Sequence, residues 1–258
     1  MTEDRGEGAT VSGGRGLAGA GLLLVLLALS GWQVAPERPS GQIDLQVRSV
    51  DRSPSSPGAR KGSRSPAFLK GVERMKIPFG PRRKRQMAAY SKRHYGKYEW
   101  RLEPRQIVLH YATAPTLGSV FNTFSDPRPD QTFGETPQVC AHFVVAPGKA
   151  VQMVSLRARC RHTLGLNHVA IGIEHLGYSD GEVIGNRGMR LRSLSLVRRL
   201  RCRYGIGVRD VIGHAESLRS RYYRERVSSL QGMTSADFSR ETMRTYRQRL
   251  SRRGCPRS

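Results

Sequence analysis

The sequence predicts an α/β fold, a single domain in which helices flank a mixed central β-sheet, with a disordered N-terminal extension before it. Short apolar runs of strand length alternate with longer segments whose apolar residues recur at helical spacing. Two of the apolar runs are separated only by Pro147 and Gly148, a turn signal that predicts an antiparallel hairpin. The 258 residues are enough for one well-cored domain plus extensions.

An uncharged run from Gly16 to Pro36 is the first feature along the chain, and its apolar core extends from Gly21 to Gly31. This core is short for a membrane span, and Ala28 and Ser30 form the small-x-small pattern of a cleavage site. Acidic residues outnumber basic ones before the run, which is untypical of a signal peptide, and a tilted helix of this length would just span a bilayer. Residues 1–36 are therefore predicted to be a signal peptide or an N-terminal membrane anchor, and either one predicts export.

The segment that follows is rich in Pro, Ser, Gly and Arg. Its stretch RSPSSPGARKGSRSPAF, residues 52–68, offers too few apolar side chains to build a core. The basic run GPRRKRQ, residues 80–86, is interpreted as a solvated continuation. We therefore expect a disordered basic linker over residues 37–86 and a globular domain over residues 87–258.

Strands and helices alternate within the predicted domain. The last helix has Ser235 and Asp237 as candidate caps. In chain order, we expect a strand over residues 106–113, a hairpin over 139–156, a strand over 168–177 and a helix over 191–206. A further strand in the stretch 208–217 should end at His214, and a helix should follow over 235–250.

The formal net charge of +24 raises the question of a nucleic-acid partner. The positive charge is spread over the linker and the domain alike, and no helix-turn-helix or zinc-finger spacing is present. Nucleic acid is therefore disfavoured, and a polyanionic cell envelope is the better candidate for an exported protein. A membrane contact is expected only through the N-terminal apolar segment.

Four cysteines allow three disulfide pairings, and the sequence does not choose among them. One detail favours Cys140 with Cys160, because each lies two residues before a histidine. A zinc finger is disfavoured because the sequence contains no CxxC.

Three side chains stand out as candidates for chemistry. Glu174 lies within the apolar strand VAIGIEHLG, where a carboxylate costs several kcal/mol unless something pairs with it. His110 and His214 each end a short apolar run, and strand ends are where open sheets present ligand-binding groups. The separation of 104 residues between these histidines matches no compact metal motif, so spacing alone does not predict a metal site.

Five sequence blocks, taken together, resemble a known family. In chain order they are IVLHYAT, CAHFVVAPGKAVQMVSL, RHTLGLNHVAIGIEHLG, VIGHAES and TSADFS. Their order is similar to that in zinc-dependent N-acetylmuramoyl-L-alanine amidases of the type 2 amidase and peptidoglycan-recognition-protein superfamily, and the resemblance extends over residues 88–250. It implies that residues 87–258 form a zinc amidase domain, which hydrolyses the amide bond between N-acetylmuramic acid and L-alanine in peptidoglycan.

The resemblance also implies roles for individual residues. His110, His214 and Asp237 match the zinc ligands, and two histidines with one carboxylate leave a fourth position open for water. Glu174 matches the catalytic glutamate, which deprotonates the attacking water. Ser235 stands where many relatives carry a Lys or His that stabilises the oxyanion, and a serine donates only a neutral hydrogen bond there.

Three further residues are expected to bind substrate: His142, His162 and Asn167. For His142 a structural role is an equally good interpretation. Among the remaining polar residues, we expect His175 to pack on the sheet face opposite Glu174. For Glu216, a helix-start acid is preferred over a carboxylate that orients His214.

The sequence thus predicts an exported cell-wall amidase that uses Zn²⁺ and acts on peptidoglycan. Its expected location is the extracellular space, the cell wall or the outer face of the cytoplasmic membrane, with anionic wall polymers as a further candidate partner. The alternative is a peptidoglycan-recognition protein that binds without cutting, although the presence of all four site residues (His110, Glu174, His214 and Asp237) speaks against it.

Overall fold

The computed structural model describes residues 67–252 and 254–255. Within this part, six strands form one mixed sheet in the order β1-β4-β3-β5-β2-β6. Strand β4 is antiparallel to β3, and every other neighbouring pair is parallel. The strands are β1 (Glu73–Arg74), β2 (Gln106–Tyr111), β3 (Phe143–Ala146), β4 (Lys149–Gln152), β5 (Ala170–His175) and β6 (Val211–Gly213).

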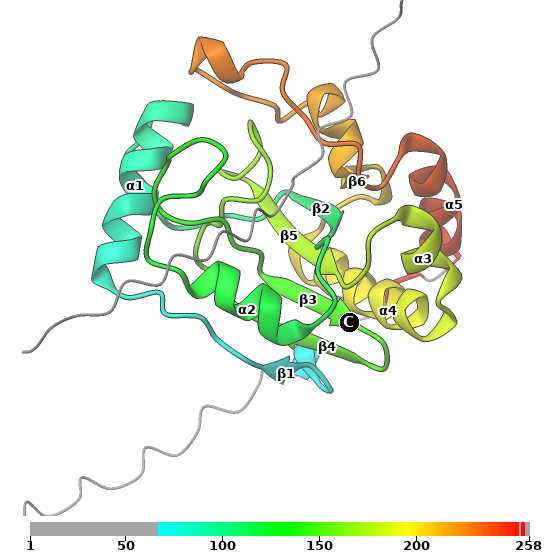
Figure 1. Ribbon diagram of the computed structural model, residues 1–258. Helices are drawn as coiled ribbons and strands as arrows, with labels where there is room; N and C mark the ends of the chain where they lie inside the picture. Colours follow the sequence, from blue (N-terminus) through cyan, green and yellow to red (C-terminus); the bar gives the residue numbers. More distant parts are fainter. Residues whose placement is uncertain (1–66, 253, 256–258) are drawn as a thin grey trace, which may run out of the picture. The chain divides into compact units, whose positions relative to one another are not determined.

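Helices cover both faces of this sheet, which confirms the predicted fold class (Figure 1). Alternate strand residues, such as Ile107 and Ile173, pack with α4 and α5 in the larger core cluster. The opposite face, which includes Val144, packs against α2. The helices are α1 (Pro81–Tyr95), α2 (Leu117–Ser125), α3 (Asp180–Gly185), α4 (Arg187–Tyr204) and α5 (Arg240–Ser251), with short 3-10 turns at Ala67–Leu69, Val208–Asp210, His214–Arg219 and Ser228–Leu230.

The predicted domain boundary at residue 87 is wrong, because residues 67–86 are folded onto the domain. Leu69, Val72 and Ile77 are buried, and β1 pairs with β4. The basic run is the first turn and a half of α1, with Pro81 at its start. Arg83 in this run is buried, and its guanidinium donates to the carbonyl oxygens of Phe124 and Gln138 at 2.6 and 2.8 Å.

Two other predicted elements differ in extent. The strand predicted within the stretch 208–217, with its end at His214, is extended only at Val211–Gly213, with 3-10 turns on either side. The last helix begins at Arg240, and its N-cap is Ser239, whose side chain accepts from the backbone of Thr242. Ser235 and Asp237 therefore lie in the preceding loop and do not cap the helix.

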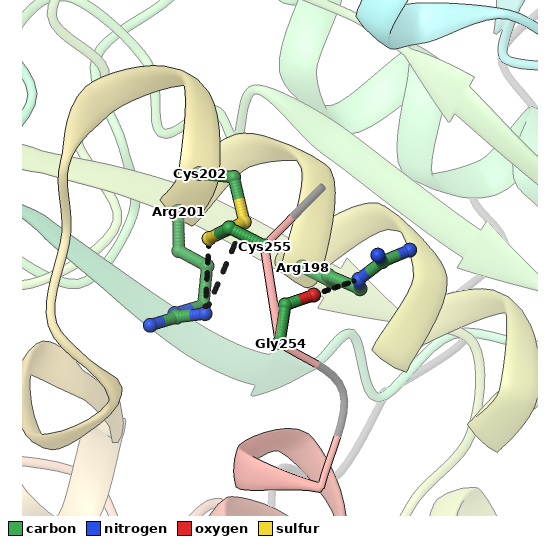
Figure 2. The surroundings of a disulfide bond; sticks show 5 residues. All are labelled: Arg198, Arg201, Cys202, Gly254 and Cys255. Carbon is green, nitrogen blue, oxygen red and sulfur yellow. Dashed lines mark hydrogen bonds between the residues drawn. A yellow bond between two sulfur atoms is a disulfide. The ribbon is translucent and has the colours of Figure 1, made fainter. Parts of the chain in front are cut away.

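A disulfide joins Cys202, near the end of α4, to Cys255 (Figure 2). Beside it, Arg198 of α4 donates to the carbonyl oxygen of Gly254 at 2.7 Å, so the C-terminal segment is held on the helix by two neighbouring contacts. This bond leaves only the pairing that the sequence favours for the other two cysteines. The Sγ atoms of Cys140 and Cys160 lie 2.6 Å apart as buried thiols.

None of the helices in the described part of the chain is both long and apolar enough to cross a membrane. The run from Gly16 to Pro36 and the greater part of the predicted linker lie outside the described residues, so the expectations for residues 1–36 and 37–66 stay predictions.

Candidate metal centre

Three candidate residues meet at one edge of the sheet, where the parallel strands β2, β5 and β6 end. His110 and Glu174 are directly paired neighbours in β2 and β5. His214 follows immediately after β6, whose Gly213 pairs with Leu109 of β2. Because the carboxyl ends of parallel strands share one edge, the topology alone brings these side chains together. Strand alternation turns His110 and Glu174 toward the face opposite α4.

Asp237 completes the group from the loop before α5. The Nδ1 atoms of His110 and His214 lie 3.1 Å apart. Oδ2 of Asp237 is 3.1 Å from Nδ1 of His110, and its Oδ1 is 3.1 Å from Nδ1 of His214. The two imidazole nitrogens thus face each other, and each faces a different oxygen of the Asp237 carboxylate. One ligand atom from each of the three residues lies within 4.8 Å of the other two, so in the described part of the chain these residues form a group that could hold a metal ion.

This donor set fits zinc. Tetrahedral zinc with nitrogen and oxygen ligands at ~2.0–2.1 Å separates neighbouring ligand atoms by about 3.3 Å, close to the spacing found here. Oδ1 of Asp237 is buried and has no hydrogen-bond partner, although Nδ1 of His214 is near. A buried carboxylate oxygen without a donor is costly, and a cation among these three side chains would satisfy it.

The electrostatics of the group match a cation site. Burial alone would raise the pKa of Asp237, but the adjacent His110 and His214 lower it overall, so the carboxylate is ionised. Burial lowers the pKa of His110 and keeps the imidazole neutral, with Asp237 opposing this effect. A charged carboxylate and neutral imidazoles are the forms that bind metal.

The loop that carries Asp237 is fixed by unusual backbone contacts. Phe238 has a φ of 54°, a conformation that a bulky residue adopts only when its surroundings impose it. The carboxylate of Asp180, at the start of α3, accepts from the backbone N–H groups of Phe238 and Ser239 at 2.7 and 2.8 Å. On the other side, the backbone N–H of Ala215 donates to the carbonyl oxygen of Asp237 at 3.0 Å.

Gly213 lets this loop approach β6 closely. A Cβ at this position would lie only 1.9 Å from the carbonyl oxygen of Phe238. Glycine is therefore required at position 213 for steric reasons, because any larger residue would push the loop of Asp237 away from His214.

Glu174 lies beside the donor set, and one of its carboxylate oxygens is in an unusual environment. Oε2 is buried and has no hydrogen-bond partner. Burial, and secondarily the charge of Asp237, raises the pKa of Glu174 to about 8. A carboxyl group whose pKa lies near neutrality can both accept and release a proton at the working pH.

Two adjoining cavities open at the site. One, of about 300 Å³, is lined by His110, Glu174, His214 and Asp237 among others. The second has a volume of about 400 Å³, and both are lined by His162, His214 and Ser235. Ser235 is exposed, so its hydroxyl can reach a ligand in either cavity.

The three residues expected to bind substrate lie in different surroundings. His142 is fully buried, its Nε2 contacts the carbonyl oxygen of Ala158, and its Nδ1 accepts from the backbone of Gly172. It lines neither cavity, so this geometry gives it a structural role and does not support substrate contact. Asn167 lines the second cavity but is 1% exposed.

His162 lines both cavities, but its two ring nitrogens already have protein partners. Nδ1 lies 3.1 Å from Nε2 of His110, and Nε2 lies 3.3 Å from the carbonyl oxygen of Ala170. These contacts leave no free ring nitrogen for a substrate.

The other expectations for individual residues hold. His175 is buried on the α4 side, between the carbonyl oxygen of His110 and the hydroxyl of Ser193. Glu216 accepts from the backbone of Gly213 and pairs with Arg247, as a helix-start acid does, and does not orient His214.

Sequence reasoning missed two contributors to the site. Asp180 fixes the loop of Asp237, and the only signal for it is a polar residue after Ser179 at a helix start. Arg161 lines both cavities, and its guanidinium contacts Asp130 and the carbonyl oxygen of Pro137. No spacing in the sequence connects these residues to the site.

A sequence profile of the N-acetylmuramoyl-L-alanine amidase family matches residues 100–228, which is half of the chain. The chain belongs to this family. The matched segment contains strands β2 to β6 and three of the four central side chains, His110, Glu174 and His214, and it ends before Asp237. Amidases of this family act on peptidoglycan, which supports the same class of substrate for this chain.

Several solved structures are similar to this amidase. A mutant endolysin from Bacillus subtilis matches at 14% identity and a TM-score of 0.45, over 69% of this chain and 97% of its own. The N-acetylmuramoyl-L-alanine amidase LysC from Clostridium intestinale matches at 16% identity and a TM-score of 0.42, over 60% and 94%. An AmpD derivative matches at 16% identity and a TM-score of 0.43, over 69% and 95%. No curated protein sequence matches the chain.

Proposed function

We propose that this protein is a zinc-dependent amidase that hydrolyses the bond between the lactyl group of N-acetylmuramic acid and L-alanine of the stem peptide. The observation that carries the proposal is the meeting of His110, His214 and Asp237, whose imidazole Nδ1 atoms lie 3.1 Å apart and each 3.1 Å from one carboxylate oxygen of Asp237. Family membership supports an amidase, and the donor chemistry supports zinc as its metal.

His110, His214 and Asp237 would hold the zinc ion, with both histidines contributing Nδ1. Zinc in a site of two imidazoles and one carboxylate lowers the pKa of water to ~7 and polarises a carbonyl oxygen. Because Asp237 is ionised and the neutral form of His110 is favoured by burial, neither residue needs to lose a proton before it binds the ion.

Glu174 would transfer the proton. Its carboxylate accepts a proton from the water molecule whose oxygen attacks the amide carbonyl carbon. The same carboxyl then gives that proton to the amide nitrogen as the C–N bond breaks, so the stem peptide leaves with a free amino group. The raised pKa, about 8, suits a group that must hold the proton between the two steps.

Ser235 and the two cavities would position the substrate. The exposed Ser235 hydroxyl can donate a hydrogen bond to the oxygen of the scissile amide, a weaker contact than a Lys or His would make. The cavities join at His162, His214 and Ser235, so the site has room on both sides of the reacting bond for the glycan and the peptide.

We also propose that the protein is exported. The support is the apolar run from Gly16 to Pro36 and the cell-wall location of the family's substrate. Anionic wall polymers are proposed as a secondary partner of the basic residues 37–66, through electrostatic attraction.

The test of the function is digestion of purified peptidoglycan by the zinc-loaded chain, followed by mass spectrometry of the products. We expect free stem peptides that begin with L-alanine, together with glycan strands of unchanged length. Glu174→Gln should retain its zinc and lose a factor of about 10²–10⁴ in kcat, because only the proton transfer is removed. A wall left intact but bound by the zinc-loaded chain would favour the non-catalytic recognition protein instead.

A further inference from the structure

We propose that His162 is a positioning residue for the metal ligand His110. Its Nδ1 accepts a hydrogen bond from Nε2–H of His110, which holds that imidazole in the tautomer whose Nδ1 lone pair faces His214 and Asp237. The inference rests on the proposed function, since it concerns how the zinc ligand is prepared.

The tautomer of His162 follows from its contact with a backbone carbonyl oxygen, which can only accept a hydrogen bond. Nε2 of His162 lies 3.3 Å from the carbonyl oxygen of Ala170 in β5. Two lone pairs facing each other would repel, so Nε2 of His162 carries the proton and donates it to this oxygen. A neutral imidazole has one donor nitrogen and one acceptor nitrogen, so with the proton on Nε2 the Nδ1 of His162 is an acceptor.

The same reasoning assigns His110. Its Nε2 lies 3.1 Å from the accepting Nδ1 of His162, so the attractive arrangement has the proton on Nε2 of His110. The hydroxyl of Thr163 supports this pattern, because it lies 2.9 Å from Nδ1 of His162 and 3.3 Å from Nε2 of His110. An imidazole protonated on Nε2 has its lone pair on Nδ1, and Nδ1 is the atom that lies 3.1 Å from Nδ1 of His214.

Two features of the chain hold His162 in place. A Cβ on Gly172 would lie 2.6 Å from the ring of His162, so the glycine of AIGIE leaves the space that the imidazole occupies. Oδ1 of Asn167 accepts from the backbone N–H groups of His162 and Thr163, both at 2.8 Å, which fixes the loop. This gives Asn167 a role in the site without contact with substrate.

Outer hydrogen-bond partners of metal-binding histidines typically change metal affinity by 10–100-fold when they are removed. We therefore expect His162→Leu, which keeps an apolar side chain of similar size and removes the acceptor, to weaken zinc binding by that factor. His162→Asn places Oδ1 where Nδ1 of the ring was, so it should restore most of the affinity.

The experiment measures the zinc dissociation constant of the full chain by competition with a chromophoric chelator, for the parent, His162→Leu and His162→Asn. His168→Leu is the matched control, because His168 lies on the same loop, has no hydrogen-bond partner for Nδ1 and contacts no metal ligand. In the zinc-loaded parent, NMR should also show a slowly exchanging Nε2–H of His110 with a scalar coupling to Nδ1 of His162. That signal should exchange rapidly in His162→Leu and be unaffected in the control.

The outcomes separate this inference from the proposed function. A parent that binds zinc tightly and a His162→Leu variant that binds it equally would overturn the positioning role alone. Equal losses in His162→Leu, His162→Asn and His168→Leu would also overturn it, because they would indicate general damage to the loop. A parent that binds no zinc would contradict the proposed metal centre, and the positioning role with it.

Discussion

Substitution of Gly213 by alanine should damage the metal centre through the backbone, without touching any ligand side chain. The new Cβ would lie 1.9 Å from the carbonyl oxygen of Phe238 and 2.8 Å from its carbonyl carbon. Real Cβ contacts essentially never fall below 3.0 Å, so the loop must retreat by about 1 Å. These are backbone atoms and cannot rotate aside as the end of a side chain could.

The magnitude follows from what the loop carries. Overpacking of this kind costs on the order of 1–3 kcal/mol in unfolding free energy. Asp237 precedes Phe238 directly, and metal–ligand distances tolerate only about 0.2 Å, so a shift of about 1 Å should also abolish tight zinc binding. Asp180 and Ala215, which hold this loop from two sides, leave it little freedom to compensate.

The assay is urea unfolding of the metal-free chain, together with a zinc titration of each variant. Gly185→Ala is the matched control, because a Cβ there meets no atom within 4 Å, and it should be neutral or stabilising by up to about 1 kcal/mol. A Gly213→Ala protein with the stability and zinc affinity of the parent would refute the argument that this glycine seats the loop of Asp237.

Four further predictions follow from the same structure. Asp180→Asn keeps the shape of the side chain but places an amide donor opposite a backbone N–H that now donates to a carboxylate oxygen. The free energy of unfolding should fall by about 1–3 kcal/mol, and the zinc affinity should fall with it. A zinc titration that matches the parent would show that Asp180 does not position Asp237. Burial lowers the pKa of His142 and of His175 to about 4, below the value of 6.5 in the unfolded chain. Each histidine should therefore lower the free energy of unfolding by up to about 1.4 kcal/mol per pH unit as the pH falls from 6.5 to 4. Equal stability in urea titrations at pH 7 and pH 5, or a His142→Asn protein with the same pH slope, would contradict this. The favoured cysteine pairing predicts that the denatured, oxidised chain has no thiol that reacts with a colorimetric reagent, whereas two reactive thiols would show that Cys140 and Cys160 stay reduced. Deletion of residues 37–66, which leaves β1 and α1 intact, should weaken binding to cell walls at low salt only; identical binding at every salt concentration would exclude the electrostatic role.

Strands β2 to β6 and three of the four central side chains, His110, Glu174 and His214, could be predicted because their signals are local, whereas Asp237 was assigned only through the resemblance to the family. An apolar run that ends in a histidine, or that encloses Glu174, is visible in a few letters, and parallel pairing then brings those ends to one edge. The helices α1 and α2 could not be predicted from sequence, each for a different reason. Helix α1 has basic residues in its first turn, against the preference of the helix dipole, and is held by the burial of Arg83. Helix α2 is rich in poor helix formers and depends on the capping box of Thr116 and Ser119.

The roles that could not be predicted depend on contacts between distant segments. His142 and His162 look alike in sequence, since each follows a cysteine by two residues, yet one is enclosed by backbone groups and the other contacts His110. What separates them is the position of each ring relative to β2 and β5. Asp180 binds the backbone of Phe238, 58 residues away, and no periodic pattern in the sequence indicates that contact.

Anomalous diffraction at the zinc absorption edge, from crystals of the metal-loaded chain, tests the central claim most directly. We predict one peak per chain, bonded to Nδ1 of His110, Nδ1 of His214 and a carboxylate oxygen of Asp237, with Glu174 beside it but not coordinated. A peak bonded through Nε2 of either histidine, a peak elsewhere in the fold, or no peak in a zinc-soaked crystal would contradict the metal centre and the mechanism built on it.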